Sequence, residues 1–198
     1  MRRQFLTGLR MTACFIVLLG LIYPAVVYGV GKLAFSDRAD GSFVKDSKGL
    51  VIGSSLIGQN FVVSNGKPDS RYFQPRPSMA GEAGYDAMSS AASNLGPSNQ
   101  DLLDEVKSRA VAYRRLNGLS RKAAVPVDAV TASASGLDPH ISIANADLQV
   151  NRVAKARGLS VSDVQALVAK HTESRQWGFL GEKVVNVLEL NLDLDRQG

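Results

Sequence analysis

The sequence predicts an α+β soluble body carried by one N-terminal transmembrane helix. Two observations predict this class: an uncharged apolar run near the N-terminus, and a remainder in which helical patterns alternate with short β-rich runs. The 198 residues are 45% apolar and 21% charged, which excludes disordered, collagen-like and fibrous proteins. We expect four parts: a basic cytoplasmic N-terminus (1–10), a transmembrane helix (11–31), a connector (32–48) and a single α+β domain (49–198).

The membrane helix is predicted by residues 11–30, which include no charged side chain. At about 1.5 Å per residue, a helix of this length crosses a hydrocarbon layer of roughly 30 Å. Pro24 would kink the helix, but proline is tolerated in membrane spans when neighbouring helices satisfy the freed carbonyl. The class is therefore a single-pass membrane protein.

The orientation of this helix follows from the charges at its two ends. Arg2, Arg3 and Arg10 precede the apolar run, whereas Lys32 is the only basic residue that follows it closely. Cytoplasmic flanks carry the excess of Lys and Arg, so the N-terminus is predicted in the cytoplasm. The expected location is the plasma (inner) membrane, with the body on the extracytoplasmic side.

Two export signals compete with the anchor interpretation. Gly29 and Gly31 would suit the cleavage site of a signal peptide, but the apolar run is longer than the 7–15 residues typical of such peptides. The pair Arg2-Arg3 also resembles a twin-arginine signal, although two arginines arise easily in any basic flank. A retained anchor is the favoured interpretation.

The net charge of +5 is concentrated near the N-terminus. Residues 1–38 hold five of the 23 Lys and Arg and one of the 18 Asp and Glu, so the body is close to neutral. Nucleic acid as a partner is excluded by this distribution, since it requires clustered positive charge on the folded domain. The one cysteine, Cys14, lies in the apolar run, so the body has neither a disulfide nor a thiolate site.

The body begins with a β-rich run and a long loop. After the polar connector, residues 49–59 are β-rich and are interrupted by Gly53 and Gly58. Residues 64–99 are dense in Gly, Pro, Ser and Asn, with little periodicity, and are predicted to form a long ordered loop. Loops of this length are often interaction surfaces.

Three amphipathic helices are predicted after this loop. A capping box that starts at Ser98 indicates a helix to about Asn117. The second helix is expected from about Ser142 and is closed by Gly158, and the third follows the capping residue Ser160.

Two strands are predicted in the same region. After Pro126, residues 127–131 form a short β-rich run. Near the C-terminus, leucines alternate strictly with polar residues, which predicts a half-buried strand with one wet face. The alternating residues are Leu188, Leu190, Leu192 and Leu194 against Glu189, Asn191, Asp193 and Asp195.

No constellation in the chain predicts an enzyme. Gly53 and Gly58 have the spacing of a phosphate-binding loop, but Gln59 replaces its lysine. His140 and His171 lack partners at metal-ligand spacing, so capping or surface roles are expected and no metal site is predicted. The GxSxG motif of a hydrolase is absent. The body is therefore predicted to belong to a non-catalytic accessory protein.

One segment carries a resemblance to a known family. Residues 133–142, SASGLDPHIS, followed by Gln149 and by residues 152–154 and 157–158, are similar to the C subunit of the Kdp-type potassium-transporting ATPase. Further stretches resemble that family in the same order, namely residues 53–59, 73–78, 93–98, 181–182 and 186–191. Ile143 departs from the pattern because the family often has proline there, a residue that is merely favoured at the first helical position.

The resemblance implies an accessory, non-catalytic subunit of a high-affinity, ATP-driven potassium uptake complex. It implies the ATP-hydrolysing and the channel-like subunits as partners, together with membrane lipid. It also implies a catalytic-chaperone role that raises the ATP affinity of the hydrolysing subunit. No firmly bound cofactor is expected, only ATP in a ternary complex, and the nucleotide-binding residues implied are Ser135, Gly136, Leu137, Asp138 and Gln149.

The charge argument opposes the chaperone role and leaves an alternative. ATP is cytoplasmic, whereas the arginines near the N-terminus place the body outside. The alternative is an extracytoplasmic structural subunit that stabilises the channel-like subunit or shapes ion entry without touching nucleotide. Asp193 and Asp195 could then attract cations, although simple solvation on the wet face of the strand is the default interpretation of both. A stand-alone anchored or exported module is a third hypothesis.

Overall fold

The computed structural model describes residues 1–46 and 48–197. Residues 47 and 198, which fall in the expected connector and at the end of the expected domain, lie outside the described residues. The chain divides into two compact units, Met1–Ser54 and Ser55–Gly198, and each is described by itself.

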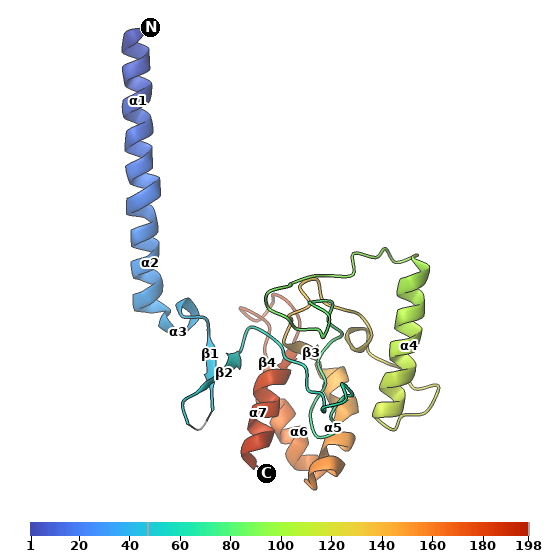
Figure 1. The fold of residues 1–198 in the computed structure, drawn as a ribbon. Coiled ribbons are helices and arrows are strands. Elements are labelled where there is room, and N and C mark those ends of the chain that lie inside the picture. Colours follow the sequence, from blue (N-terminus) through green and yellow to red (C-terminus); the bar gives the residue numbers. More distant parts are fainter. Residues whose placement is uncertain (47, 198) are drawn as a thin grey trace. The chain divides into compact units, whose positions relative to one another are not determined.

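The first unit begins with a long apolar helix, which Figure 1 shows as a single rod. It consists of α1 (Arg2–Val17), a π-helical turn (Leu18–Ile22) and α2 (Tyr23–Ala34). The whole stretch, Arg2–Ala34, is long and apolar enough to cross a membrane, and none of its apolar window is buried within the protein. The prediction of one apolar N-terminal helix is confirmed.

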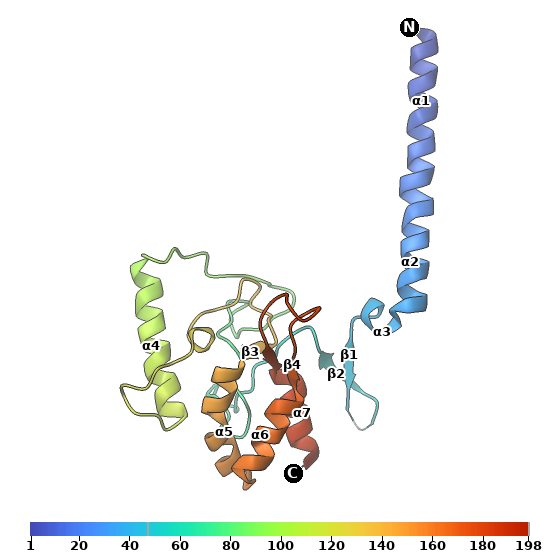
Figure 2. The ribbon, with the colours of Figure 1, turned by 180° about the vertical axis from the view of Figure 1, so that it is seen from behind.

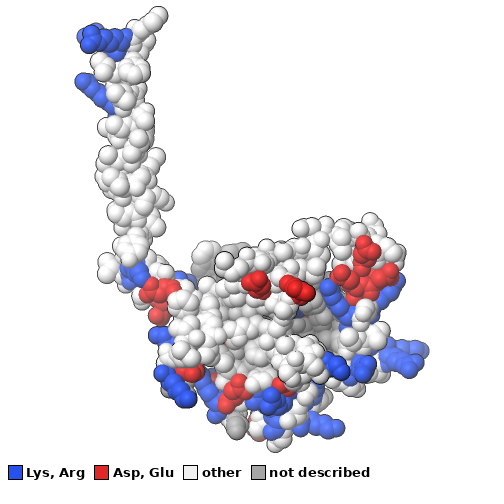
Figure 3. Space-filling view, in the orientation of Figure 1, with Lys and Arg blue, Asp and Glu red and all other residues white. Residues whose placement is uncertain are grey.

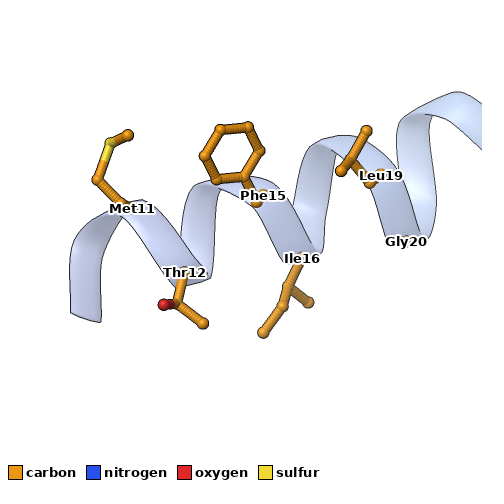
Figure 4. Close-up of a pocket in the computed structure, with 6 residues that line it drawn as sticks. All are labelled: Met11, Thr12, Phe15, Ile16, Leu19 and Gly20. Atoms are coloured by element: carbon orange, nitrogen blue, oxygen red, sulfur yellow. The ribbon is translucent and has the colours of Figure 1, made fainter. Parts of the chain in front are cut away.

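The π-helical turn lies directly before Pro24, which has no backbone N–H to donate to the carbonyl four residues earlier. The Tyr23 N–H bonds to the Leu18 carbonyl five residues back, as a π-turn requires. The proline is thus accommodated by a wider turn of the helix. Figure 4 shows helix turns that precede Pro24. Met11, Phe15 and Leu19 form one row of side chains, and Thr12 and Ile16 project from the opposite side of the helix.

The first unit ends in a small hairpin. A short helix, α3 (Ser36–Ala39), precedes strand β1 (Phe43–Lys45), which pairs antiparallel with β2 (Val51–Ser54). The ladder pairs Phe43 with Ser54 and is interrupted by a bulge after Val44. The predicted β-rich run therefore forms a strand in its first half only.

The second unit packs helices against a small sheet (Figures 1 and 2). The sheet has three antiparallel strands in the order β3-β5-β4. These are β3 (His140–Ser142), β4 (Thr172–Glu173) and β5 (Val184–Asn186). The predicted α+β class is confirmed.

Four α-helices complete the described part of this unit, residues 55–197. They are α4 (Gln100–Leu116), α5 (Ile143–Arg157), α6 (Val161–Lys170) and α7 (Val187–Gln197). In both views α4 stands at the edge of the unit, away from α6 and α7. The main core lies where α5, α6, α7 and the sheet meet, and it includes Phe73, Ile141, Ala146, Val150, Val153, Val164, Leu167, Val185, Leu190 and Leu194.

The three predicted helices are confirmed, and their capping residues explain where they begin. Ser142 and Ser160 each accept a hydrogen bond from the N–H three residues on, at 3.1 Å, and Gly158 ends α5 with a φ of 69°. For α4 the cap is Asn99 rather than Ser98, because the Asn99 side chain accepts from the first free N–H groups of the helix.

Both predicted strands in this region were wrong. Residues 187–197 form α7, because Val187, Leu190 and Leu194 recur at helical spacing and are buried together in the core. The alternating leucines misled the prediction because Leu190 and Leu194, four residues apart, fit the period of a helix as well as that of a strand. Residues 127–129 form one 3₁₀ turn, in which Asp128 accepts hydrogen bonds from the Ser142 N–H and hydroxyl at 2.7 and 2.9 Å.

The predicted loop of residues 64–99 contains neither helix nor strand, which agrees with its composition. It is nevertheless well anchored, because Phe73 is completely buried in the core and Ala80 is completely buried nearby. The segment is therefore ordered by its contacts with the body rather than by regular secondary structure.

Candidate functional site

The segment Ser133 to Asp138 is a compact turn held by its own side chains. The Ser133 hydroxyl accepts a hydrogen bond from the Gly136 N–H at 2.9 Å, and the Ser135 hydroxyl accepts one from the Leu137 N–H at 3.1 Å. Ser and Asp side chains favour such local bonds, which replace helix or strand pairing. Four predicted site residues, Ser135, Gly136, Leu137 and Asp138, therefore lie together in this turn.

The turn is also fixed by hydrogen bonds from distant segments. The Ser135 carbonyl accepts from the Ala91 N–H at 3.0 Å, and the Gly136 carbonyl accepts from the Ser78 hydroxyl at 2.6 Å. The Leu137 carbonyl accepts from the Gly58 N–H at 2.9 Å. The backbone of the turn is thus bonded to the rest of the protein, while the Ser135 side chain is exposed.

Gly136 is required by this packing. Its φ is 68°, and a Cβ atom placed there would lie 2.8 Å from both the Ala80 nitrogen and the Ala91 oxygen. These backbone atoms belong to two neighbouring loop segments and cannot move aside as a flexible side chain would. Only glycine fits this position without displacing the loop.

A charged cluster follows the turn. The Asp138 carboxylate accepts from the Arg76 guanidinium at 3.0 Å and lies 3.3 Å from Nδ1 of His140, whose Nε2 is 3.3 Å from Glu173. Burial opposes ionisation of Asp138, but bonds from His140 and the charge of Arg76 outweigh it, so the pKa of Asp138 is lowered. The bond to Asp138 raises the pKa of His140 against the opposing effect of burial, and Glu173 adds to the rise.

A groove of about 310 Å³ lies beside this cluster. Its polar lining mixes both signs of charge, with Arg76, Lys183 and His140 opposed by Asp128, Asp138 and Glu182. Such a lining suits a small polar ligand or a polar segment of a partner better than a polyphosphate, for which carboxylates are repulsive.

Gln149, the fifth predicted site residue, lies inside the protein and is 0% exposed. Its carbonyl oxygen accepts from the Gln74 N–H and from Arg152, each at 2.7 Å. Its amide nitrogen donates to the Gln74 carbonyl at 3.1 Å and to Asn145 at 2.9 Å. Every polar atom of this side chain is therefore occupied by the protein itself, so its visible role is to hold the 73–74 segment on α5.

Arg152 and Asn191 extend this buried network. Arg152 donates to Asn117 at 2.9 Å and to the Ser70 and Tyr72 carbonyls at 2.7 and 2.9 Å, and burial lowers its pKa to about 10. Asn191 forms a reciprocal pair with the backbone of Phe73, with both bonds at 2.9 Å. Sequence reasoning quoted Arg152 only as part of the resemblance and placed Asn191 on the wet face of a predicted strand, whereas both side chains are buried.

The acids near the C-terminus are paired within the chain rather than free on a wet face. Asp193 is buried and lies 2.6 Å from Lys170 and 2.8 Å from Nε2 of His171. Bonds from Lys170 and then His171 lower the pKa of Asp193 to about 2. Asp195 accepts from Arg157 at 2.8 Å, so the positions expected to attract cations already have cationic partners.

No group of three or more His, Cys, Asp or Glu side chains in residues 1–46 and 48–197 is arranged to hold a metal ion. His171 serves as a link between α6 and α7, and His140 as a link between β3 and β4.

Comparison with a family of known proteins gives a match along almost the whole chain. The family is described as "K+-transporting ATPase, c chain", and it matches residues 5–196. The match includes both the apolar helix and the body, so it does not depend on one motif.

Individual relatives agree over the same length. The chain is 53% identical to the "Potassium-transporting ATPase KdpC subunit" of Mycobacterium tuberculosis (strain ATCC 25618 / H37Rv) over 196 residues, covering 99% of this chain and 100% of the relative. The protein of that name from Koribacter versatilis is 49% identical, covering 98% and 95%. That from Geobacter metallireducens is 48% identical, covering 96% and 95%.

Proposed function

Because the chain belongs to the KdpC family of K+-transporting ATPase c chains, we propose that it is the accessory, non-catalytic subunit of a potassium uptake complex. Its proposed partners are the ATP-hydrolysing subunit and the channel-like subunit, which would carry out ATP hydrolysis and ion selection. The helix of residues 2–34 anchors it in the membrane beside them.

The distribution of charge along the helix supports an extracytoplasmic body. Figure 3 shows basic side chains at the free end of the helix and then a long stretch without charge. These basic residues are Arg2, Arg3 and Arg10, and the body follows the opposite end of the helix in the sequence. Since positive flanks tend to remain in the cytoplasm, this distribution supports a body on the extracytoplasmic side.

An outside body would act by contact with the channel-like subunit. The turn at residues 133–138 and the ordered loop of residues 64–99 are linked by hydrogen bonds, so they present a preformed surface. A surface fixed in advance loses little entropy on binding, which favours stable assembly. In this proposal the body stabilises the complex or shapes ion entry, and no residue of the chain touches nucleotide.

The second proposal is the catalytic chaperone, in which Ser135, Gly136, Leu137, Asp138 and Gln149 assist ATP binding by the hydrolysing subunit. It is favoured by the exposed side chain of Ser135 in the turn, whereas the carboxylates that line the groove beside Asp138 oppose a polyphosphate. Contact with ATP would then be made by the turn, while Gln149 would contribute from the interior by holding α5. This mechanism requires the body to be cytoplasmic.

One experiment separates the two proposals. Cys14→Ser removes the native thiol, and Ser98→Cys places one thiol at an exposed position of the body. Labelling by a membrane-impermeant maleimide in intact cells would establish the outside body. Labelling only after lysis would exclude it and leave the chaperone mechanism. A cysteine at Thr7, before the apolar run, is the matched control and should give the opposite result.

Membership of a complex is tested separately by purification in mild detergent. A tagged chain should bring down a potassium-dependent ATPase in stoichiometric amount. Absence of any ATPase, under conditions in which the chain stays folded, would contradict the accessory-subunit proposal.

A further inference from the structure

An exposed hairpin joins β4 to β5 in the second unit. We call residues 174–182 the aromatic hairpin. All residues from 173 to 183 are exposed, and although Glu173, Glu182 and Lys183 lie against the body at the base, the tip of the segment is open to solvent. Its apolar side chains are unusually open, with Trp177 85%, Phe179 67% and Leu180 43% exposed.

The hairpin is ordered by its own hydrogen bonds. Gln176 and Leu180 exchange two backbone bonds of 2.9 Å each, and Arg175 pairs with Glu182 at 2.7 Å near the base. Trp177 is held at a φ of 52°, a region that L-residues enter only where the surrounding turn fixes them. The aromatic side chains are therefore presented by a preformed structure.

The tip is suited to a medium of low polarity. The Gly178 N–H bonds to the Arg175 carbonyl at 3.0 Å, and the Phe179 N–H bonds to the Gln176 carbonyl at 3.3 Å. These donors can leave water without a large free-energy cost because they remain paired. Trp and other amphipathic aromatic side chains favour the boundary between lipid headgroups and acyl chains.

The proposed anchor helix and its connector hold the second unit near a membrane. Residues 35–54 separate the end of α2 from the second unit, so a fully extended connector reaches about 70 Å at most. The tether keeps the hairpin close to the membrane surface, and its effective concentration there is high. The second unit can thus reach a lipid surface while the chain is anchored.

We propose that the aromatic hairpin inserts Trp177, Phe179 and Leu180 into the headgroup boundary of the membrane in which the chain is anchored. This inference rests on the proposed membrane anchoring. The four charged residues from 173 to 183, namely Glu173, Arg175, Glu182 and Lys183, cancel in net charge. Apolar burial rather than attraction to anionic lipid drives the insertion, so zwitterionic lipid suffices and salt has little effect.

Trp177 is the only tryptophan in the chain and therefore serves as the probe. The full-length protein is reconstituted in phosphatidylcholine vesicles, and its tryptophan emission is compared with that in vesicles whose lipids carry bromine at chosen depths. We expect emission shifted to the blue and quenched most strongly by bromine near the headgroups. High salt should leave the quenching unchanged.

Two variants separate tip insertion from other causes. Phe179→Ala combined with Leu180→Ala should shift the emission to the red and reduce quenching by brominated lipid. Met88→Ala, which removes another highly exposed apolar side chain far from the hairpin in sequence, should change neither. Thermal unfolding of each variant verifies that the body remains folded.

Three results would overturn the inference. In the first, brominated lipid does not quench Trp177 although the chain resists alkaline carbonate extraction and is therefore anchored. Another is crosslinking of a photoreactive group at Phe179 to a partner subunit, and not to lipid, in the purified complex. Extraction by carbonate would remove the anchoring proposal as well, which distinguishes failure of the anchor from failure of the hairpin.

Discussion

At the scale of single residues, the body is organised by polar side chains that pair with the backbone of a long loop. Gln149 and Asn191 each form a reciprocal pair with one residue of this loop, Gln74 and Phe73 respectively. Buried amides of this kind stabilise only when every donor and acceptor is paired. Their loss affects the loop first and any function of the body through it.

Gly136→Ala should lower the free energy of unfolding by about 2–5 kcal/mol, since it adds a left-handed alanine and a backbone clash. Gly158→Ala is the matched control because its φ is 69° but no atom lies within 4 Å of the added Cβ. That control should lose about 1–2 kcal/mol, from backbone strain alone. Urea unfolding measures both, and equal losses would contradict the packing argument.

Gln149→Ala should destabilise the body by about 2–4 kcal/mol, because it leaves the Gln74 N–H without its partner and opens a cavity. The same substitution at exposed Gln165 on α6 should change stability by less than about 0.5 kcal/mol. Thermal unfolding provides the measurement. A folded, fully stable Gln149→Ala protein that fails to support ATP use would instead indicate a direct role in nucleotide binding.

At the scale of elements, prediction succeeded where the signal is local. The caps at Ser142 and Ser160 and the glycine at 158 lie within a few residues of the helix ends that they determine. The helical state of residues 187–197 was missed because its alternating leucines fit two periods, and burial of Asn191 and Asp193 depends on partners in other elements. The candidate turn was reached through resemblance, since its geometry depends on Ala80 and Ala91.

The link between β3 and β4 should respond to pH. The pKa of His140 is raised above its ordinary value of 6.5, mainly by Asp138 and with help from Glu173. A group with a raised pKa contributes stability below its unfolded pKa, and this contribution disappears as pH rises through the folded pKa. The stability difference between the wild type and His140→Gln should therefore be larger at pH 6 than at pH 9.

This comparison is made by urea unfolding at each pH. Glu173→Gln should weaken the pH dependence without abolishing it, because Asp138 remains beside the imidazole. A stability difference that is constant across this range would show that protonated His140 contributes nothing to the link.

At the scale of the whole molecule, the chain combines an apolar helix that could span a membrane with a body that has its own core. The helix buries none of its apolar window within the protein, whereas the body buries the aliphatic faces of α5, α6 and α7. Sequence hydropathy predicted this division because it needs no knowledge of tertiary contacts.

Leu18→Arg should impair membrane insertion, since an arginine at the centre of a membrane helix costs about 2.5–3.5 kcal/mol relative to water. The fraction of chain that resists carbonate extraction should fall, and Leu18→Ala should remain close to the wild type. Unchanged extraction of Leu18→Arg would indicate that this helix does not span the bilayer.

The pairing of Asn191 with Phe73 has a consequence for biosynthesis. The two residues are 118 positions apart, and Asn191 lies in the last helix of the chain. While the ribosome is still making the C-terminal end, the loop around Phe73 has no permanent place to bind. The body therefore completes its core only after α7 has left the ribosome, and until then the loop around Phe73 is exposed to non-native contacts.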